Sequence, residues 1–261
     1  MIDIHTHVLP GFDDGAPDLK TSVAMLQMAQ EHQTTAVVVT PHVIEGKWFP
    51  SWQEIKSGYE LLRQEALQSG VQIAIYPGAE VAMSLEILKL LSEPGPYCIN
   101  CSRYLLVELP SQEIPFFADH FFFSLQLKGM VPILAHPERH PELAKYPEIL
   151  RKWVEKGVIT QMNGSSLLGR MGERVQATAE LFLKQHLVHC IGSDAHGVNY
   201  RRPQLQEAAV KIIHWVGEKQ AKLLLVENPK RIITDQSIDV SSTQEPILCR
   251  SLVQIRHWFQ R

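Results

Sequence analysis

Short apolar runs alternate with longer amphipathic stretches along most of the chain. Seven runs rich in β-branched and other apolar residues have the length and composition of buried strands. They cover residues 2–4, 36–40, 72–76, 104–108, 131–135, 158–162 and 188–192. Because apolar strands that alternate with helices are typical of parallel sheets covered on both faces, this pattern predicts a parallel α/β fold.

The stretches between and after these strands carry apolar residues at helical spacing. The predicted helices cover residues 19–31, 52–68, 116–128, 146–156, 173–185, 204–216 and 219–225. Asp18 stands in the N-cap position of the first helix, and Ser51 and Glu54 have the spacing of a capping box at the second. The apolar stripes, such as Val23 with Leu26, are predicted to face the core.

The end of the chain departs from this alternation. Residues 234–245 are polar and have no periodicity, and residues 247–261 predict an amphipathic helix with Leu248, Leu252, Ile255 and Phe259 on one side. We therefore expect a barrel domain at residues 1–233 and a tail at residues 234–261. The tail is expected to pack on the barrel or on the partner subunit of a homo-oligomer.

Composition narrows the class of protein. A chain of 261 residues fits one large α/β barrel, and its hydrophobic fraction of 45% is ordinary for a globular protein. A formal net charge of −3 provides no general attraction to nucleic acid or to an anionic membrane. Asp3 and His5 interrupt the opening apolar run, so no secretory leader is expected there, and no run is long enough to span a membrane. The expected location is the cytoplasm.

The cysteines, Cys98, Cys101, Cys190 and Cys249, are too few and too scattered for a disulfide scaffold. Cys98 and Cys101 have C-x-x-C spacing, but a zinc ribbon requires a second such pair. We expect free thiols. No cysteine is followed six positions later by arginine, which excludes the usual loop of cysteine-nucleophile phosphatases.

Residue types that bind metals follow six of the seven predicted strands. They are His5, His7 and Asp14, then His42, Glu80, Glu108 and His136, and finally Asp194 and His196. The carboxyl ends of the strands in a βα barrel surround one mouth, so these nine side chains are expected to meet there. Any one of them alone would be an ordinary solvated or hydrogen-bonded residue, but their coincidence favours a metal site.

Other catalytic motifs are not found. The sequence contains no G-x-x-x-x-G-K-[ST], no H-E-x-x-H and no G-x-S-x-G. His136-Pro137-Glu138 has the H-x-E spacing of nucleobase deaminases, but the C-x-x-C that should follow it lies upstream.

The motifs DIHTHVLPGFDDGA, TPH, PGAE, VELP, AHPER and GSDAH together resemble the polymerase and histidinol phosphatase (PHP) superfamily. Within it, they are similar to the bacterial capsule-type tyrosine-protein phosphatases. The resemblance extends from residue 1 to about residue 231 and includes ENPKRI. It implies a distorted seven-stranded TIM-like barrel with three divalent metal ions, commonly manganese.

The resemblance also implies how the ligands divide among the ions. His5, His7, Glu80 and Asp194 would hold one ion, Glu80, Glu108 and His136 a second, and Asp14, His42 and His196 the third. Five neutral imidazoles and four carboxylates around three divalent ions leave a pocket charge of about +2, which attracts a phosphomonoester. Such mixed ligands suit manganese, iron or zinc, and the sequence leaves the metal open.

The implied chemistry is phosphomonoester hydrolysis by metal-activated water, without a covalent enzyme intermediate. A tyrosine phenolate, with a pKa of about 10, needs little help from a general acid as it leaves. Arg139 is the first candidate for a phosphate contact. Arg201 or Arg202 is the second, and the Arg-Arg pair leaves that choice open.

The resemblance implies a phosphotyrosine protein substrate, and we expect the tyrosine autokinase that controls capsular or exopolysaccharide synthesis. The alternatives are a small-molecule phosphatase such as histidinol-phosphate phosphatase, an amidohydrolase-like metal hydrolase, and a non-catalytic binding module. Trp48, Phe49 and Trp52 are predicted to pack, with contact to a phosphotyrosine ring as the alternative. His140 is expected to support the site or to be exposed.

Overall fold

The computed structural model describes residues 1–239, so Cys249 and the helix predicted at residues 247–261 lie outside the described residues. Its strands form two parallel sheets, ordered β1-β2-β4 and β3-β5-β6-β7-β8-β9. The strands are β1 (Ile2–Thr6), β2 (Ala36–Val39), β3 (His42–Val43), β4 (Ala74–Pro77), β5 (Glu80–Ala82), β6 (Tyr104–Glu108), β7 (Val131–Ala135), β8 (Ile159–Asn163) and β9 (Cys190–Gly192). The parallel α/β fold predicted from the sequence is confirmed.

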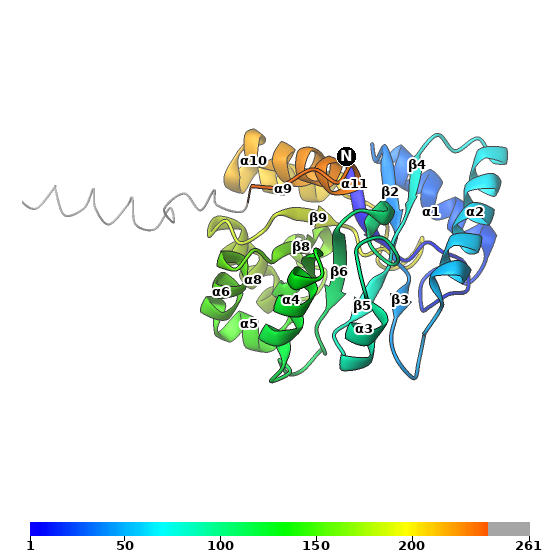
Figure 1. Cartoon of the computed structure of the whole chain (residues 1–261). Coiled ribbons are helices and arrows are strands. Elements are labelled where there is room, and N and C mark those ends of the chain that lie inside the picture. The colour runs from blue at the N-terminus through cyan, green and yellow to red at the C-terminus, as the bar shows by residue number, and fades with distance from the viewer. Residues whose placement is uncertain (240–261) are drawn as a thin grey trace, which may run out of the picture.

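Helices cover the strands from several sides. The longer ones are α1 (Leu19–Glu31), α2 (Trp52–Gln68), α4 (Ala118–Leu127), α6 (Pro147–Glu155), α8 (Glu173–Lys184) and α9 (Gln206–Val216). The shorter ones are α3 (Leu85–Leu90), α5 (Pro141–Lys145), α7 (Gly164–Leu167), α10 (Glu218–Lys222), α11 (Asn228–Ile233), η1 (Ile99–Cys101), η2 (Pro137–Arg139) and η3 (Leu223–Glu227). Figure 1 shows α1 and α2 on one side of the strands, and α4, α5, α6 and α8 on the other.

Local signals place the helix starts well. The Asp18 carboxylate accepts a hydrogen bond from the Thr21 amide at 2.7 Å, and α1 has the predicted bounds. The capping box at α2 is complete, because the Glu54 amide donates to Ser51 Oγ and the Glu54 carboxylate accepts from the Ser51 amide. Each cap satisfies amides that the first helical turn leaves without partners.

The seven predicted strands are all present, but the expected closed ring of seven strands is not confirmed. Two short strands that were not predicted, β3 and β5, follow β2 and β4 and belong to the other sheet. Between β2 and β3, Pro41 has no amide hydrogen to donate, and the Thr6 amide bonds the Thr40 hydroxyl at 3.0 Å instead of a strand carbonyl. A single bridge from Thr6 to Ala195 joins the end of β1 to the segment after β9.

The strands are buried on both faces. Leu105 and Val107 belong to a large apolar cluster between the strands and the helices, whereas Tyr104 and Leu106 belong to a second cluster. The second cluster takes residues from both sheets and from α11, including Ile4, Val38, Ile133, Ile159 and Ile232. The two sheets therefore enclose a common core, which fixes the relative positions of their carboxyl ends.

The beginning of the predicted tail packs on this body. Arg103 Nε donates to Asp235 Oδ1 at 2.9 Å, the Tyr104 hydroxyl donates to the Gln236 carbonyl at 2.7 Å, and Ile238 is buried. Residues 234–238 thus cover one end of the second apolar cluster.

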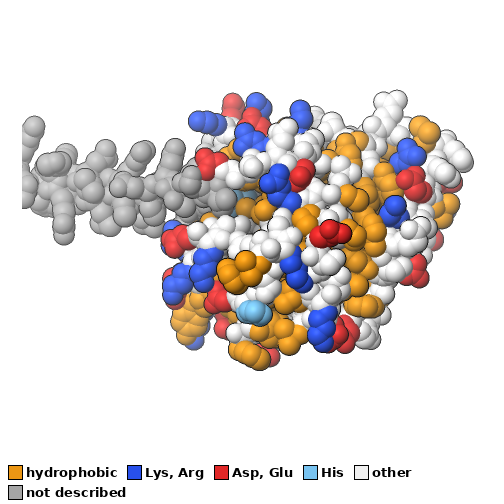
Figure 2. All heavy atoms as spheres, in the orientation of Figure 1, with side chains coloured by type: hydrophobic (Ala, Val, Ile, Leu, Met, Phe, Trp, Pro, Cys, Tyr) orange, Lys and Arg blue, Asp and Glu red, His pale blue; other side chains and the backbone are white. Residues whose placement is uncertain are grey.

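On the face seen in Figure 2, basic and acidic side chains are interspersed, and no large area carries charge of a single sign. No helix within residues 1–239 offers an apolar stretch long enough to cross a membrane. Cys98, Cys101 and Cys190 are free thiols, as predicted.

Candidate metal centre

All nine metal-binding candidates lie where the parallel strands end. His5 belongs to β1, and His7 and Asp14 follow it; His42, Glu80 and Glu108 belong to β3, β5 and β6; His136 follows β7, and Asp194 and His196 follow β9. β2, β4 and β8 contain none of them. Since parallel strands present their carboxyl ends at one edge, residues far apart in the chain become neighbours here.

The middle of the cluster is built by His5, His7, Glu80 and Asp194, which are all buried. His5 Nε2 lies 3.1 Å from His7 Nε2, 3.3 Å from Glu80 Oε2 and 3.4 Å from Asp194 Oδ1. His7 Nε2 lies 3.3 Å from each of the same two oxygens. Four potential ligand atoms therefore converge on one point.

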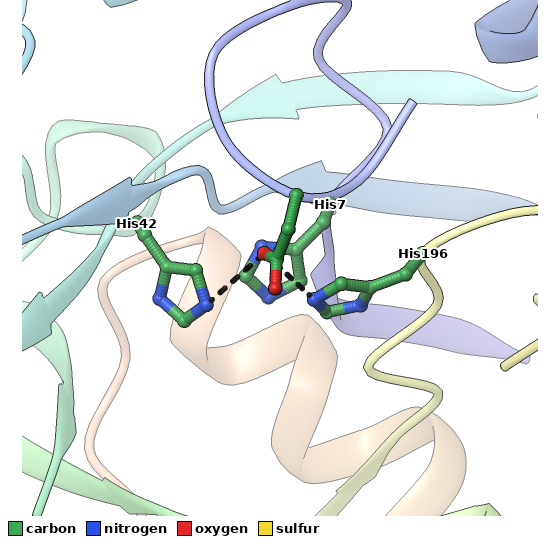
Figure 3. Close-up of side chains that lie close together, drawn as sticks. His7, His42 and His196 are labelled. Atoms are coloured by element: carbon green, nitrogen blue, oxygen red, sulfur yellow. Dashed lines mark ion pairs between the residues drawn. The ribbon is translucent and has the colours of Figure 1, made fainter. Parts of the chain in front are cut away.

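A second group adjoins His7. Asp14 Oδ1 lies 3.7 Å from His42 Nε2 and 3.4 Å from His196 Nε2. Figure 3 shows His42 and His196 on opposite sides of His7, with dashed lines from both rings to the carboxylate between them. The rings of His7 and His196 are 4.0 Å apart between centroids.

A third group lies on the other side of Glu80. His136 Nε2 lies 3.1 Å from Glu80 Oε1 and 3.5 Å from Glu108 Oε1. His42 Nδ1 also approaches these two residues, at 3.0 Å from Glu80 Oε2 and 3.8 Å from Glu108 Oε2. Glu80 is therefore shared between the middle of the cluster and this group.

The cluster contains four overlapping sets of ligand atoms, each with all its atoms within 4.8 Å of one another. The sets are His7, Asp14, His42 and His196; His5, His7 and Glu80; His5, His136 and Asp194; and His42, Glu80 and Glu108. Together they contain all nine candidates. Their membership differs in part from the expected division, because His7 joins the set of Asp14, and His42 joins that of Glu108.

Hydrogen bonds at Nδ1 fix how three of the histidines point. His5 Nδ1 bonds Gln161 Oε1 at 2.8 Å, His7 Nδ1 bonds Asp13 Oδ2 at 2.7 Å, and His196 Nδ1 bonds the Asp194 carbonyl at 3.0 Å. Each of these oxygens is an acceptor, so Nδ1 carries a proton in all three rings and Nε2 is the nitrogen that faces the cluster. Nε2 is therefore the atom that each ring would offer to a metal ion.

Three of these supporting residues were not anticipated from the sequence: Asp13, Gln161 and Asn163. Gln161 Nε2 donates to Asn163 Oδ1 at 2.9 Å, and Asn163 Nδ2 donates to Asp194 Oδ2 at 2.7 Å, so the two amides of β8 connect His5 to Asp194. For Gln161 and Asn163, the available signal was the presence of polar side chains in a predicted buried strand that supplies no candidate ligand.

Two glycines allow the elements to approach this closely. A Cβ at Gly15 would lie 2.1 Å from the His7 carbonyl oxygen, and a Cβ at Gly192 would lie 2.8 Å from the His5 Cβ. Substitution at either position would displace a histidine of the cluster. His136 and Asp194 themselves have φ angles of 32° and 53°, a strained backbone conformation for residues that have a side chain.

The electrostatics of the cluster favour cations. Burial alone would raise the pKa of Asp194, but the nearby His5 charge and a hydrogen bond with His7 hold that pKa well below its usual value. The pKa of Glu80 is likewise held well below its usual range, since the charges of His5 and His42 outweigh burial. Burial and the neighbouring His7 lower the pKa of His196 to about 2, so its ring is neutral. The Asp194 and Glu80 carboxylates are therefore ionised and attract cations, while the neutral His196 ring can act as a ligand.

Several buried atoms of the cluster have no hydrogen-bond partner. They include His42 Nδ1, Glu80 Oε2 and His196 Nε2. A buried polar atom without a partner is costly unless a ligand satisfies it. These atoms, together with the imidazole and carboxylate donors around them, fit divalent metal ions.

The arginine candidates separate clearly. Arg139 Nη1 donates to Asp194 Oδ2 at 3.0 Å, and the Arg201 guanidinium contacts the same oxygen. Arg202 is exposed instead, and its Nε donates to the Asn199 carbonyl at 3.3 Å. The pair that the sequence left open is thus divided by geometry, with Arg201 at the cluster and Arg202 outside it.

The flanking aromatic residues and His140 also have distinct positions. Trp48 stacks on His42 with ring centroids 5.4 Å apart and planes at 6°, whereas Trp52 packs toward Tyr97 and Phe49 is half exposed. His140 is buried, and its Nε2 is 3.1 Å from the Pro110 carbonyl oxygen. Trp48 is therefore the aromatic residue of this set that borders the site.

Fold and site together define a class: parallel α/β proteins that gather imidazole and carboxylate ligands for divalent ions at the carboxyl ends of their strands. Residues 1–234 match the family described as capsular polysaccharide synthesis, CpsB/CapC, and this chain belongs to that family. The family resemblance inferred from the motifs is thereby confirmed.

Named relatives agree with this assignment. The chain is 32% identical to the tyrosine-protein phosphatase YwqE of Bacillus subtilis, over 91% of this chain and 93% of that protein. It is 31% identical to the tyrosine-protein phosphatase CpsB of Streptococcus pneumoniae, over 91% of this chain and 100% of that protein.

Solved structures show the same likeness. A structure from the study of YwqE and CpsB, described there as unique metal-dependent tyrosine phosphatases, superposes with a TM-score of 0.88 at 31% identity, covering 94% of this chain and 98% of that one. The lactonase Lmo2620 of Listeria monocytogenes has a TM-score of 0.54 at 13% identity, covering 90% of this chain and 95% of that one, and shares the fold alone.

Proposed function

We propose that this protein is a metal-dependent protein-tyrosine phosphatase, and that the nine clustered side chains are its metal ligands. The observation that carries the proposal is the convergence of imidazole and carboxylate donors around Glu80, with two guanidinium groups beside them. Membership of the CpsB/CapC family and the similarity to named tyrosine-protein phosphatases support it.

The proposed centre holds three divalent ions, with manganese as the first choice and iron or zinc as alternatives. Overlapping sets of donors suit ions that share ligands, and Glu80, which faces two groups through different oxygens, is the proposed bridge. Three divalent ions among four carboxylates would leave a local charge of about +2 in a protein of net charge −3. That local charge would attract a phosphomonoester.

Bound divalent ions would supply Lewis-acid activation of water and neutralise charge on phosphoryl oxygens. The residues of the chain would supply orientation. Their partners hold a proton on Nδ1 of His5, His7 and His196, so Nε2 of each ring already faces the place where a cation would bind. A phenolate needs little protonation as it leaves, so a dedicated general acid is unnecessary.

The two arginines at Asp194 are proposed to bind the phosphate. Asp194 Oδ2 accepts from Arg139 and Asn163 and contacts Arg201, which holds both guanidinium groups at the edge of the cluster. Each guanidinium has further donors that can form paired hydrogen bonds with phosphoryl oxygens. Trp48, stacked on His42, would offer an apolar surface to the phosphotyrosine ring.

The proposed substrate is a phosphotyrosine protein, and the tyrosine autokinase of capsular or exopolysaccharide synthesis is the proposed partner. The proposed location is the cytoplasm. We further propose that the two sheets act together as one distorted seven-stranded barrel in a domain of residues 1–233, because they enclose a common core and the Thr6–Ala195 bridge joins their ends.

The test measures metal content and hydrolysis of a phosphotyrosine peptide with manganese, for the wild type and for His136→Ala. We expect the variant to fold, to bind less metal, and to lose turnover by ~100-fold or more, because a ligand next to the bridging carboxylate is removed. His120→Ala, at an exposed histidine, is the matched control and should retain full turnover.

A parallel assay with histidinol phosphate addresses the alternative substrate class. A clear preference for histidinol phosphate over the peptide would contradict the proposed function, as would unchanged turnover in His136→Ala.

A further inference from the structure

A cavity of about 540 Å³ opens beside the candidate metal centre, and apart from Arg201 its lining has no part in the proposed chemistry. Its walls include Arg170, Met171, Tyr200, Arg201, Arg202 and Glu207. These residues come from the loop between α7 and α8, from the segment between β9 and α9, and from α9 itself. The segment after β9 also carries Asp194 and His196, so the cavity adjoins the centre at the same edge of the sheet.

Arg201 belongs to the cavity and to the metal centre at once. Its guanidinium contacts Asp194, and its carbonyl accepts a hydrogen bond from the His196 amide at 2.9 Å. A phosphotyrosine held by Arg201 would therefore enter with its peptide backbone beside this cavity. Consecutive Cα atoms are about 3.8 Å apart, so only residues within two or three positions of the phosphotyrosine could reach into it.

The charge of the cavity is opposite to that of the whole protein. Three guanidinium groups line it against the single carboxylate of Glu207, although the chain has a net charge of −3. Arg170 Nη2 is 2.8 Å from Glu207 Oε2, and both side chains are substantially exposed. Within residues 1–239, no carboxylate lies within salt-bridge distance of Arg202. Among the described residues, the Arg202 guanidinium thus has no carboxylate partner, and the ion pair of Arg170 with Glu207 is accessible to solvent.

We propose that this cavity is a specificity subsite for acidic residues that flank the phosphotyrosine of the protein substrate. The proposal rests on the proposed phosphatase function and adds a substrate class to it. Arg170 and Arg202 bind the flanking carboxylates, Met171 and Tyr200 contact the methylene groups of the same side chains, and Glu207 competes for Arg170. The excess of positive charge disfavours basic flanking residues for the same reason.

The first experiment compares two phosphotyrosine peptides that differ only in having Glu or Gln at the positions flanking the phosphotyrosine. Free phosphotyrosine, which has no flanking residues, is the reference substrate. The wild-type enzyme with manganese should hydrolyse the Glu peptide with the higher kcat/KM, and the preference should shrink at 0.5 M salt, where the Debye length is about 4 Å. Equal kcat/KM values for the two peptides at low salt would overturn the proposal.

The second experiment repeats these assays with Arg170→Gln, Arg202→Gln and Glu207→Gln. Each arginine variant should lower kcat/KM for the Glu peptide about threefold to fivefold, in keeping with an exposed ion pair, and leave the Gln peptide and free phosphotyrosine unchanged. Glu207→Gln should raise kcat/KM for the Glu peptide, because Arg170 loses its competing carboxylate. If these residues had only a structural role, kcat/KM would fall for all three substrates, and that result would overturn the proposed subsite.

The matched control is Arg63→Gln, which removes an exposed arginine paired with a carboxylate on α2, outside the cavity. It should not change the preference between the peptides, and an equal effect in this control would also overturn the subsite. Failure of the proposed function is distinguishable from failure of the subsite, because in that case the wild-type enzyme would not hydrolyse free phosphotyrosine either.

Discussion

Asp13 and Asp14 are neighbours in the chain with different surroundings. Asp14 is half exposed and faces His42 and His196, whereas the Asp13 carboxylate is buried beneath His7. Asp13 Oδ2 bonds both His7 Nδ1 and the His42 amide, and Oδ1 accepts from the Gly15 amide. Burial is outweighed by the bonds and charge of His7, which lower the pKa of Asp13 to about 2, so it is ionised at neutral pH. One carboxylate thus positions two candidate ligands, one just after β1 and one in β3.

We expect Asp13→Asn to weaken metal binding without unfolding the protein. The amide cannot supply the negative charge that holds the proton on His7 Nδ1, and losing such a supporting carboxylate typically costs about 10- to 100-fold in metal affinity. The measurement is activity against manganese concentration, and the half-saturating concentration should rise by about that factor. Asp18→Asn, which keeps a good N-cap residue, is the control, and identical manganese curves for Asp13→Asn and the wild type would contradict the assigned role.

At the scale of elements, the start of the β8–β9 pairing depends on a side chain. His189 lies just before β9 and is buried. Its amide donates to the Thr160 carbonyl at 3.1 Å, and the Thr160 amide donates back to His189 Nδ1 at 3.1 Å. A proton on Nδ1 would face the Thr160 N–H, so this pairing requires the neutral ring. Burial accordingly lowers the pKa of His189 from 6.5 to about 4.

This pairing predicts a loss of stability in acid. Below its unfolded-state pKa of about 6.5, His189 binds a proton in the unfolded chain but not in the folded one, so stability falls as the pH drops from 6.5 to 4. The full effect is about 3 kcal/mol. His189→Asn, whose side-chain oxygen can accept from Thr160 without titrating, should show a flatter pH dependence of the free energy of unfolding, measured in a chelator so that metal loss does not contribute.

The exposed His120 provides the control for this experiment, since His120→Asn should retain the wild-type slope. If His189→Asn and the wild type lost stability in parallel between pH 6.5 and pH 4, the assignment of this loss to His189 would be wrong.

At the scale of the whole molecule, the candidate centre joins both sheets. Its side chains come from β1, β3, β5 and β6 and from the segments after β1, β7 and β9, so ions bound there would tie together elements that are distant in the chain. The unfolded chain cannot present these ligands together. Metal binding should therefore stabilise the folded state as a unit.

Adding manganese to metal-free protein at about 100 times its dissociation constant should stabilise the fold by about 2.7 kcal/mol. For a domain of this size, the Tm should rise by about 5–10 °C, as measured by calorimetry. Glu80→Gln, which removes the carboxylate shared between groups, should have a smaller rise. An equal rise in both proteins would show that Glu80 does not hold the ions.

Short sequence patterns were sufficient to predict much of the fold and the candidate site of this protein. Three features depend only on neighbouring residues and on the common direction of parallel strands: the apolar runs, caps such as Asp18, and the ligand types at strand ends. The predictions made from them agree with the family, the parallel α/β fold and the tyrosine-phosphatase relatives. Which residues lie beside one another across the molecule depends on backbone paths that no local pattern records. The break at Pro41, the support from Gln161 and Asn163, and the choice of Arg201 over Arg202 therefore emerged only when the strands had been brought together around one core.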